Sequence, residues 1–142
     1  MTNLTNTAEQ QTLEFVNYEV RDRVGYITLS RPEKRNALNF EVVTELKRAF
    51  AFAEEDEASK VIVLRAEGKV FCAGADLEYL QRLQENDYQE NLLDSTHLME
   101  LFRAIYTLKK VVIAQIHGHA IAGGCGLAAI CLLYTSPSPR DS

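Results

Sequence analysis

The chain of 142 residues contains few cysteines, no excess of basic charge and no long hydrophobic run. Its 15 lysines and arginines are outnumbered by 20 aspartates and glutamates, giving a net charge of −5. This balance argues against nucleic acid or an anionic membrane as a partner, because clustered basic side chains supply most of that affinity. No run approaches the roughly 18 apolar residues of a membrane span, and residues 1–12 lack the basic and apolar regions of a secretory signal. The sequence therefore predicts a cytoplasmic protein.

The three cysteines, Cys72, Cys125 and Cys131, form no CxxC pair. Their odd number is typical of reduced thiols rather than of a disulfide framework. Cys72 and Cys125 have no obvious histidine partner, so both are interpreted as small buried residues. The three histidines come with no recognisable set of further ligands, and no metal site is predicted.

The pattern along the chain predicts an α/β domain preceded by a flexible lead at residues 1–12. β-forming residues at 13–30 surround a turn at Asp22–Arg23 and predict a hairpin. A helix is expected to begin at Phe40, with Asn39 as its N-cap. Its apolar residues recur at helical spacing at Phe40, Val43, Leu46, Phe50 and Ala53.

Two apolar runs, Val61–Leu64 and Val111–Ala114, show no alternation and predict strands buried on both faces. Between them, residues 77–90 are charged and are expected to hold a short helix and a connection. A second long helix follows, with its apolar side chains near one face at Leu92, Met99, Phe102 and Tyr106. Strands alternating with helices define the α/β class.

The last residues, 132–142, do not continue this pattern. They end in a proline- and serine-rich segment without a core-facing period, and the string resembles a translated adaptor or vector sequence. The domain is therefore drawn over residues 13–131, with 132–142 interpreted as a non-native tail. The alternative is a natural disordered terminus.

Two glycine-containing loops follow the predicted buried strands, where open α/β folds place their ligands. In the second loop, Gly118 and Gly123 have Walker A spacing, but Gly124 and Cys125 replace the required lysine and hydroxyl residue. What remains is a glycine pair at a helix N-terminus, whose exposed N–H groups suit an oxyanion. Taken alone, the pair is better explained by close backbone packing than by a binding site.

The first loop, residues 71–76, is a second turn of small residues leading into a helix. One N–H donor from each loop, aimed at the same oxygen, would form an oxyanion hole. With the segment 31–38, these two loops resemble in order and spacing the crotonase family, the enoyl-CoA hydratase/isomerase group. The resemblance covers about residues 13–130. It implies a spiral of ββα units, truncated before the second half of the core and the C-terminal helices.

The resemblance also implies the site. The oxyanion donors fall on the N–H groups of Ala75 and Gly123, which would grip the thioester oxygen of an acyl-CoA substrate. Lys34, Arg35, Ala37 and Leu38 fall on the segment that lines the coenzyme A site, although a solvated turn explains Lys34 and Arg35 equally well. The remaining expected substrate contacts are Ala73, Gly74, Asp76 and Gly124. Asp76 is interpreted as a helix N-cap rather than as a catalytic acid.

The family resemblance implies no metal and no redox cofactor, because coenzyme A is part of the substrate. It also implies a homotrimer or a dimer of trimers. The predicted function is that of an enoyl-CoA hydratase, a lyase adding water to a 2-enoyl-CoA. A double-bond isomerase and a non-catalytic acyl-CoA-binding fragment are the alternatives.

Three departures from the family pattern bear on this choice. Gly126 stands where many hydratases place a catalytic glutamate, although methylglutaconyl-CoA hydratases share a glycine there. Val111 replaces a common proline, and Glu78 replaces a lysine that reaches coenzyme A. No general base is named among the 142 residues, so this chain alone is expected to lack turnover.

Overall fold

The computed structural model describes residues 13–74, 81, 84, 85, 87–117, 119, 120, 127 and 131. The predicted lead, 1–12, and tail, 132–142, lie outside these residues. In chain order the elements are β1 (Val16–Arg21), β2 (Val24–Leu29), the 3-10 helix η1 (Pro32–Lys34), α1 (Phe40–Glu55), β3 (Val61–Ala66), β4 (Val70–Cys72), α3 (Tyr88–Tyr106), β5 (Val111–Ala114) and β6 (His119–Ala120). The α/β class predicted from the sequence is confirmed.

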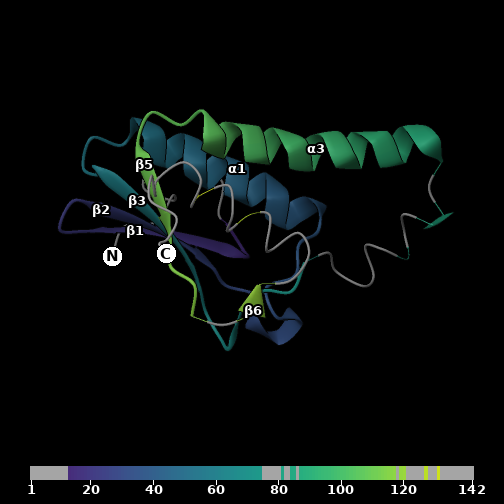
Figure 1. Ribbon diagram of the computed structural model, residues 1–142, viewed down its shortest axis with the longest axis horizontal. Coiled ribbons are helices and arrows are strands. Elements are labelled where there is room, and N and C mark those ends of the chain that lie inside the picture. Colours follow the sequence, from purple (N-terminus) through teal and green to yellow (C-terminus); the bar gives the residue numbers. More distant parts are fainter. Residues whose placement is uncertain are drawn as a thin grey trace, which may run out of the picture.

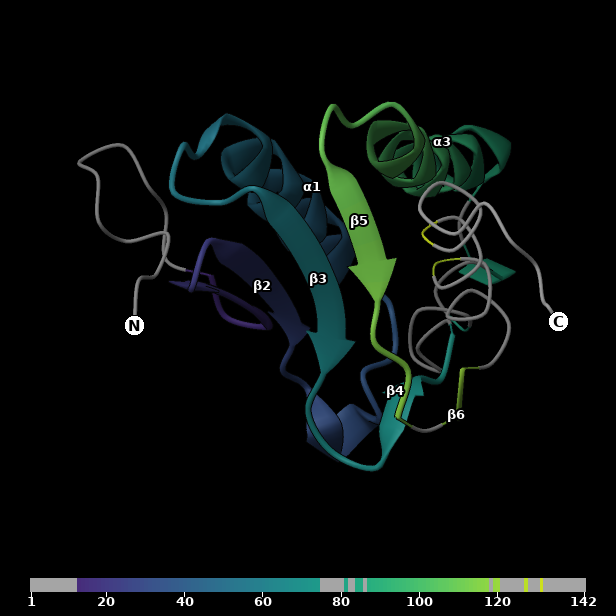
Figure 2. The same ribbon diagram turned by 60° about the vertical axis from the view of Figure 1, so that its left-hand side comes forward.

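A four-stranded sheet in the order β1-β2-β3-β5 carries the fold (Figure 2). β1 and β2 form the predicted antiparallel hairpin, whereas β2, β3 and β5 run parallel. The hairpin turns at Asp22 and Arg23, where φ is 52° and 69°. Two successive positive φ values give the turn a twist that matches the flanking strands. β4 pairs with β6 in a separate two-stranded sheet, and the sequence had not predicted β4 as a strand.

Helix α1 begins at the predicted residue. The side chain of Asn39 accepts a hydrogen bond from the Val42 N–H at 2.9 Å, which satisfies one of the free donors of the first turn. Most of the predicted apolar stripe is buried against the sheet, but Phe40 is 39% exposed. Phe40 is the first residue of the helix, and its ring stacks on His97 of α3.

The sequences of the two apolar strands had predicted burial on both faces. In the structure, only one face of each strand is buried. In β3, Ile62 and Leu64 are fully buried while Val61 and Val63 are only partly covered. In β5, the outward residues Val111 and Ile113 are 47% and 43% exposed. The physical reason is visible in Figure 1, where α1 and α3 lie together on one face of the sheet. Among the described elements, no helix covers the opposite face.

The inward face of α3 also differs from the prediction. The helix starts at a capping box in which the Asp87 carboxylate accepts from the Glu90 N–H and the Glu90 carboxylate accepts from the Asp87 N–H. Its buried residues are Leu101 and Ile105, which face α1 and the sheet. Of the apolar residues predicted to lie near one face, Leu92 and Met99 are 51% and 62% exposed, whereas Phe102 is partly buried against the core.

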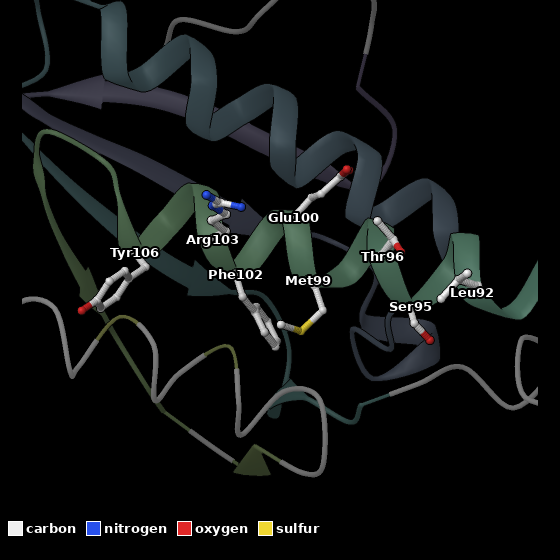
Figure 3. A pocket seen from close by; sticks show the side chains of 8 residues that line it. All are labelled: Leu92, Ser95, Thr96, Met99, Glu100, Phe102, Arg103 and Tyr106. Carbon is white, nitrogen blue, oxygen red and sulfur yellow. The ribbon is translucent and has the colours of Figure 1, made fainter.

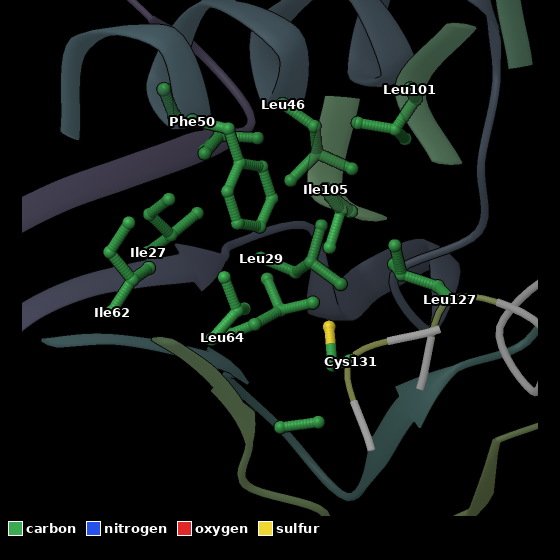
Figure 4. Close-up of a cluster of buried hydrophobic side chains, with 14 of the residues drawn as sticks. Ile27, Leu29, Leu46, Phe50, Ile62, Leu64, Leu101, Ile105, Leu127 and Cys131 are labelled. Carbon is green, nitrogen blue, oxygen red and sulfur yellow. The ribbon is translucent and has the colours of Figure 1, made fainter. Parts of the chain in front are cut away.

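One hydrophobic core joins the sheet to both helices (Figure 4). Its largest fully buried side chains come from every layer: Tyr18, Ile27, Leu29, Leu46, Phe50, Ile62, Leu64, Phe71, Leu101, Ile105 and Leu127. Burial of such side chains contributes about 1.5–3 kcal/mol each before the entropy of ordering is subtracted. Of the helices described, none combines the length and the apolar character needed to cross a membrane.

Candidate functional site

The three parallel strands end at the same edge of the sheet. Leu29 at the end of β2 pairs with Ala66 at the end of β3, and Leu64 of β3 pairs with Ala114 at the end of β5. In open α/β sheets, ligands bind outside the carboxyl ends of the strands, because the following loops converge there. The three loops that follow these strands therefore define the candidate site.

The loop after β2 is held in one conformation by its own backbone and by Arg31. Pro32 opens the short helix η1, and Arg35 then adopts a φ of 52°. The guanidinium of Arg31 is buried and donates to the Ala37 carbonyl at 3.1 Å. It also lies 5.2 Å from the ring centre of Phe15, which favours a cation over its face. The loop is thus fixed on the sheet edge before any ligand arrives.

Two backbone hydrogen bonds join this loop to the one after β3. The Leu38 N–H donates to the Gly74 carbonyl at 2.6 Å, and the Ala73 N–H donates to the Arg35 carbonyl at 3.1 Å. Figure 2 shows η1 beside β4 at this end of the molecule. The structure therefore brings together Arg35, Leu38, Ala73 and Gly74, which the sequence had assigned to one substrate site from two distant segments.

The exposure of these residues divides them into two kinds. The side chains of Lys34 and Arg35 are exposed on the surface of the turn. Ala37 and Leu38 are 7% and 3% exposed, so both residues are buried beneath the turn. The Ala37 carbonyl accepts from Arg31, and its N–H donates to the Lys34 carbonyl at 3.0 Å. Four further predicted residues lie outside the described residues: Ala75, Asp76, Gly123 and Gly124.

The loop after β5 reaches the same place. The ring Nε2 of His117 makes a short hydrogen bond to the Gly68 carbonyl. Gly68 itself has a φ of +87°, and a Cβ on it would lie 3.0 Å from the Cβ of Pro32. Residues other than glycine rarely adopt this φ. Residue 68 therefore combines a backbone constraint with a close approach to the loop after β2. Neither Gly68 nor His117 was expected from the sequence to have this role.

Among the titratable groups near the site, the Cys72 thiol is fully buried at the end of β4, and desolvation by burial raises its pKa. The same cause raises the pKa of Cys131 to about 12. Burial keeps both thiols protonated at neutral pH, which makes them poor nucleophiles. For Cys72 this agrees with its prediction as a small buried residue. Cys125 is not among the described residues. Within the described ranges, no group of three His, Cys, Asp or Glu residues is arranged to hold a metal.

A hollow of about 790 Å³ lies along the outer side of α3. Figure 3 shows that Met99 and Phe102 point into it, away from α1. Its lining combines apolar and polar side chains: Leu92, Ser95, Thr96, Met99, Glu100, Phe102, Arg103 and Tyr106. The apolar residues predicted near one face of this helix thus line this hollow, and Phe102 among them also packs against the core.

Comparisons with known proteins identify the family. Residues 19–136 match the sequence profile of the Enoyl-CoA hydratase/isomerase family, and the chain belongs to that family. Mitochondrial enoyl-CoA hydratase of Pongo abelii is 37% identical over 121 residues, which cover 83% of this chain and 40% of that protein.

Solved structures agree with this assignment. An enoyl-CoA hydratase from Polaromonas sp. JS666 is 32% identical with a TM-score of 0.78, over 82% of this chain and 45% of that one. One from Shewanella pealeana is 25% identical with a TM-score of 0.80, over 87% of this chain and 45% of that one. The fold is therefore that of the crotonase-like enzymes, as predicted. The chain spans less than half the length of the curated relatives it matches.

Proposed function

We propose that this chain supplies the acyl-CoA-binding half of an enoyl-CoA hydratase-type lyase, which adds water to a 2-enoyl-CoA thioester. One observation carries the proposal. The segment expected to line the coenzyme A site is joined by backbone hydrogen bonds to the loop that leads directly into the first expected oxyanion donor, Ala75. Membership of the enoyl-CoA hydratase/isomerase family supports it.

The chemistry requires stabilisation of an enolate. When water adds to the β-carbon of a 2-enoyl thioester, negative charge develops on the thioester oxygen. Fixed N–H donors stabilise that charge more than they stabilise the ground state, and one donor is worth about 3 kcal/mol of barrier. We assign the two donors to the N–H groups of Ala75 and Gly123, with Gly124 and Asp76 beside them.

The coenzyme A portion is assigned to the loop after β2. Lys34 and Arg35 are exposed cations on a short turn, where they meet phosphate groups without the cost of burying a charge. The buried backbone at Ala37 and Leu38 and the adjoining Ala73 and Gly74 form the wall between those phosphates and the thioester. The substrate brings coenzyme A with it, so the proposal involves no separate cofactor.

Turnover is a separate question from binding. Hydration needs carboxylates that deprotonate water and protonate the α-carbon, and Gly126 stands where the family resemblance places one of them. We therefore propose that the 142-residue chain binds acyl-CoA thioesters without converting them. Assembly into a trimer or a pair of trimers stays a prediction. A cytoplasmic location also stays a prediction, since two relatives are named as mitochondrial enzymes.

The test is a titration of the purified chain with crotonyl-CoA, followed by calorimetry and by the ultraviolet absorbance of the conjugated thioester. We expect saturable binding with no loss of absorbance. Gly123→Val should weaken binding by removing room at the oxyanion site. Lys34→Ala should weaken binding of free coenzyme A as well, whereas Lys60→Ala, an exposed lysine at the opposite end of β3, should leave both unchanged.

Each alternative gives a different result. Loss of absorbance catalysed by the chain would overturn the assignment of binding without turnover. Absence of binding to both crotonyl-CoA and coenzyme A would overturn the acyl-CoA site itself. Conversion to a product of unchanged mass, in which the double bond has moved, would replace the hydratase assignment by an isomerase. Mass spectrometry distinguishes this product from the hydrated one.

A further inference from the structure

Asn36 is a polar residue buried at the centre of the candidate site. Its side chain and backbone are 1% exposed, and its φ of 55° lies in the left-handed region. Asparagine adopts that region more readily than most residues, but the conformation still has to be held by its surroundings. A buried amide is also costly unless its donors and acceptor are satisfied.

The Asn36 side chain satisfies all of these groups by contacting two different loops. Its Oδ1 accepts from the Arg31 N–H at 2.8 Å, within its own loop. Its Nδ2 donates to the Glu67 carbonyl at 2.7 Å and to the Val70 carbonyl at 2.9 Å. Those carbonyls flank the turn between β3 and β4. Gly68 lies within this turn, close to Pro32.

The residues beside Asn36 make the two backbone hydrogen bonds between the loop after β2 and the loop after β3, which together are called the backbone bridge. Arg35, directly before Asn36, accepts from the Ala73 N–H, and Leu38, two residues after it, donates to the Gly74 carbonyl. The side-chain amide of Asn36 thereby fixes the loop after β2 against the β3–β4 turn. The backbone bridge fixes the same loop against residues 73–74. A displacement of the amide would change the position of the loop after β2 relative to the β3–β4 turn and to residues 73–74.

We propose that Asn36 is a positioning residue of the acyl-CoA site: its amide sets the placement of residues 73–74, and through them the N–H of the next residue, relative to the coenzyme A segment. The inference rests on the proposed function, because the N–H whose position is set is the one proposed to bind the thioester oxygen. Misplacement of an oxyanion donor by about 1 Å reduces stabilisation of the developing charge, since the donor must meet the oxygen at hydrogen-bond distance.

The sharpest variant is Asn36→Asp. Aspartate has nearly the same shape, tolerates the left-handed region and keeps the acceptor for Arg31, but its carboxylate cannot donate to the Glu67 and Val70 carbonyls. The matched control is Asn39→Asp, three residues away, because aspartate is as good an N-cap as asparagine. Asn36→Gly is the second variant: it keeps the positive φ and removes the side chain without adding a buried charge.

The first readout is amide hydrogen exchange of the 142-residue chain by NMR. In Asn36→Asp and Asn36→Gly, the amide protons of Leu38 and Ala73 should exchange at least about tenfold faster, while amides inside β3 keep their wild-type rates. Asn39→Asp should change neither set. If Asn36→Asp does not fold, all its amides lose protection together, and Asn36→Gly then provides the measurement.

The second readout detects the thioester directly. A 3-aryl-2-enoyl-CoA absorbs at longer wavelength when hydrogen bonds polarise its carbonyl oxygen. At saturating probe, the red shift should be smaller in the Asn36 variants than in wild type and in Asn39→Asp. A role confined to stability would lower the melting temperature and leave the shift of the bound, folded fraction unchanged.

The outcomes separate the inference from the proposed function. Faster exchange at Leu38 and Ala73 together with a smaller red shift supports Asn36 as a positioning residue. Unchanged exchange at both amides, or an unchanged red shift in the bound variants, overturns it. If the wild-type chain binds no probe, the proposed function fails, and the exchange rates alone then decide whether Asn36 controls the bridge.

Discussion

The ring of His97 on α3 stacks on the ring of Phe40 at the start of α1, with 4.0 Å between ring centres and 18° between ring planes. Nδ1 of His97 lies 2.7 Å from the Lys47 ammonium, a group that only donates. Nδ1 is therefore the acceptor, and Nε2 carries the proton that faces the Phe40 carbonyl at 3.2 Å and Thr44 Oγ1 at 2.9 Å. This arrangement requires a neutral imidazole.

A pH-dependent stability follows from this contact. Burial, and then the Lys47 charge, lower the pKa of His97, while Phe40, Glu100 and Asp94 act in the opposite direction. Because the unfolded chain binds this proton more readily, the stabilisation is present above about pH 6.5 and is lost as the pH falls through the lower pKa of the folded state. Urea unfolding at pH 5, 6, 7 and 8 should show stability rising through this range.

Two variants identify the group responsible. His97→Asn should flatten the rise of stability with pH, because it removes the titrating ring. His117→Asn, which alters an exposed histidine, should leave the rise intact. An unaltered slope in His97→Asn would assign the pH dependence to other groups.

Lys110 stabilises the carboxyl end of α1 from another part of the chain. Its ammonium donates to the carbonyls of Ala53, Asp56 and Ser59 at 2.7, 2.7 and 2.6 Å. Lys110→Met keeps the apolar stem and leaves these carbonyls to water, so we expect a loss of about 2 kcal/mol in the free energy of unfolding. The neighbouring Lys109 is exposed, and Lys109→Met should cost less than about 0.5 kcal/mol. Equal losses would contradict the role of the ammonium.

The orientation of α3 is tested by two identical substitutions on the same helix. Leu101 is fully buried and Leu93 is 67% exposed. Leu101→Ala should reduce the free energy of unfolding by about 3 kcal/mol, because it removes buried methyl groups and leaves a cavity. Leu93→Ala should change it by less than about 0.5 kcal/mol. Chemical denaturation of both variants checks this, and the reverse order would mean that the opposite face is packed.

Gly25 in β2 is constrained by space rather than by backbone angle. An added Cβ would lie 2.6 Å from Ser59 Oγ and 3.0 Å from the Tyr18 hydroxyl oxygen. The Tyr18 hydroxyl is itself fixed by donating to the Asp56 carboxylate at 2.7 Å. Gly25→Ala should therefore cost about 2 kcal/mol through overpacking.

A double-mutant cycle isolates the cause of that loss. Ser59→Ala removes the oxygen that an alanine at position 25 meets first, so the two changes together should cost less than the sum of their separate effects. Thermal unfolding of the two single variants and the double variant gives the comparison. Strict additivity would show that the loss has another origin.

Local patterns in the sequence predicted the elements that depend on near neighbours. The turn at Asp22–Arg23, the N-cap at Asn39 and the start of α1 all depend on residues within a few positions, and each was confirmed. The short strand β4 was missed because three residues in a glycine-containing loop carry no period, and they become a strand only by pairing with β6. The bridge between Leu38 and Gly74 joins segments that the sequence assigned to one site only through a family resemblance.

The sequence by itself determined the α/β class, the hairpin, the capped helix and the family, because these follow from spacing, turn chemistry and motif order along the chain. Only the tertiary structure decided which faces are covered. The same apolar spacing in α3 permits two inward faces, and packing against α1 selected the one with Leu101 and Ile105. It also decided the role of Asn36. The hydrogen-bond acceptors of this buried amide are carbonyls more than 30 residues away, which only folding brings within hydrogen-bond distance.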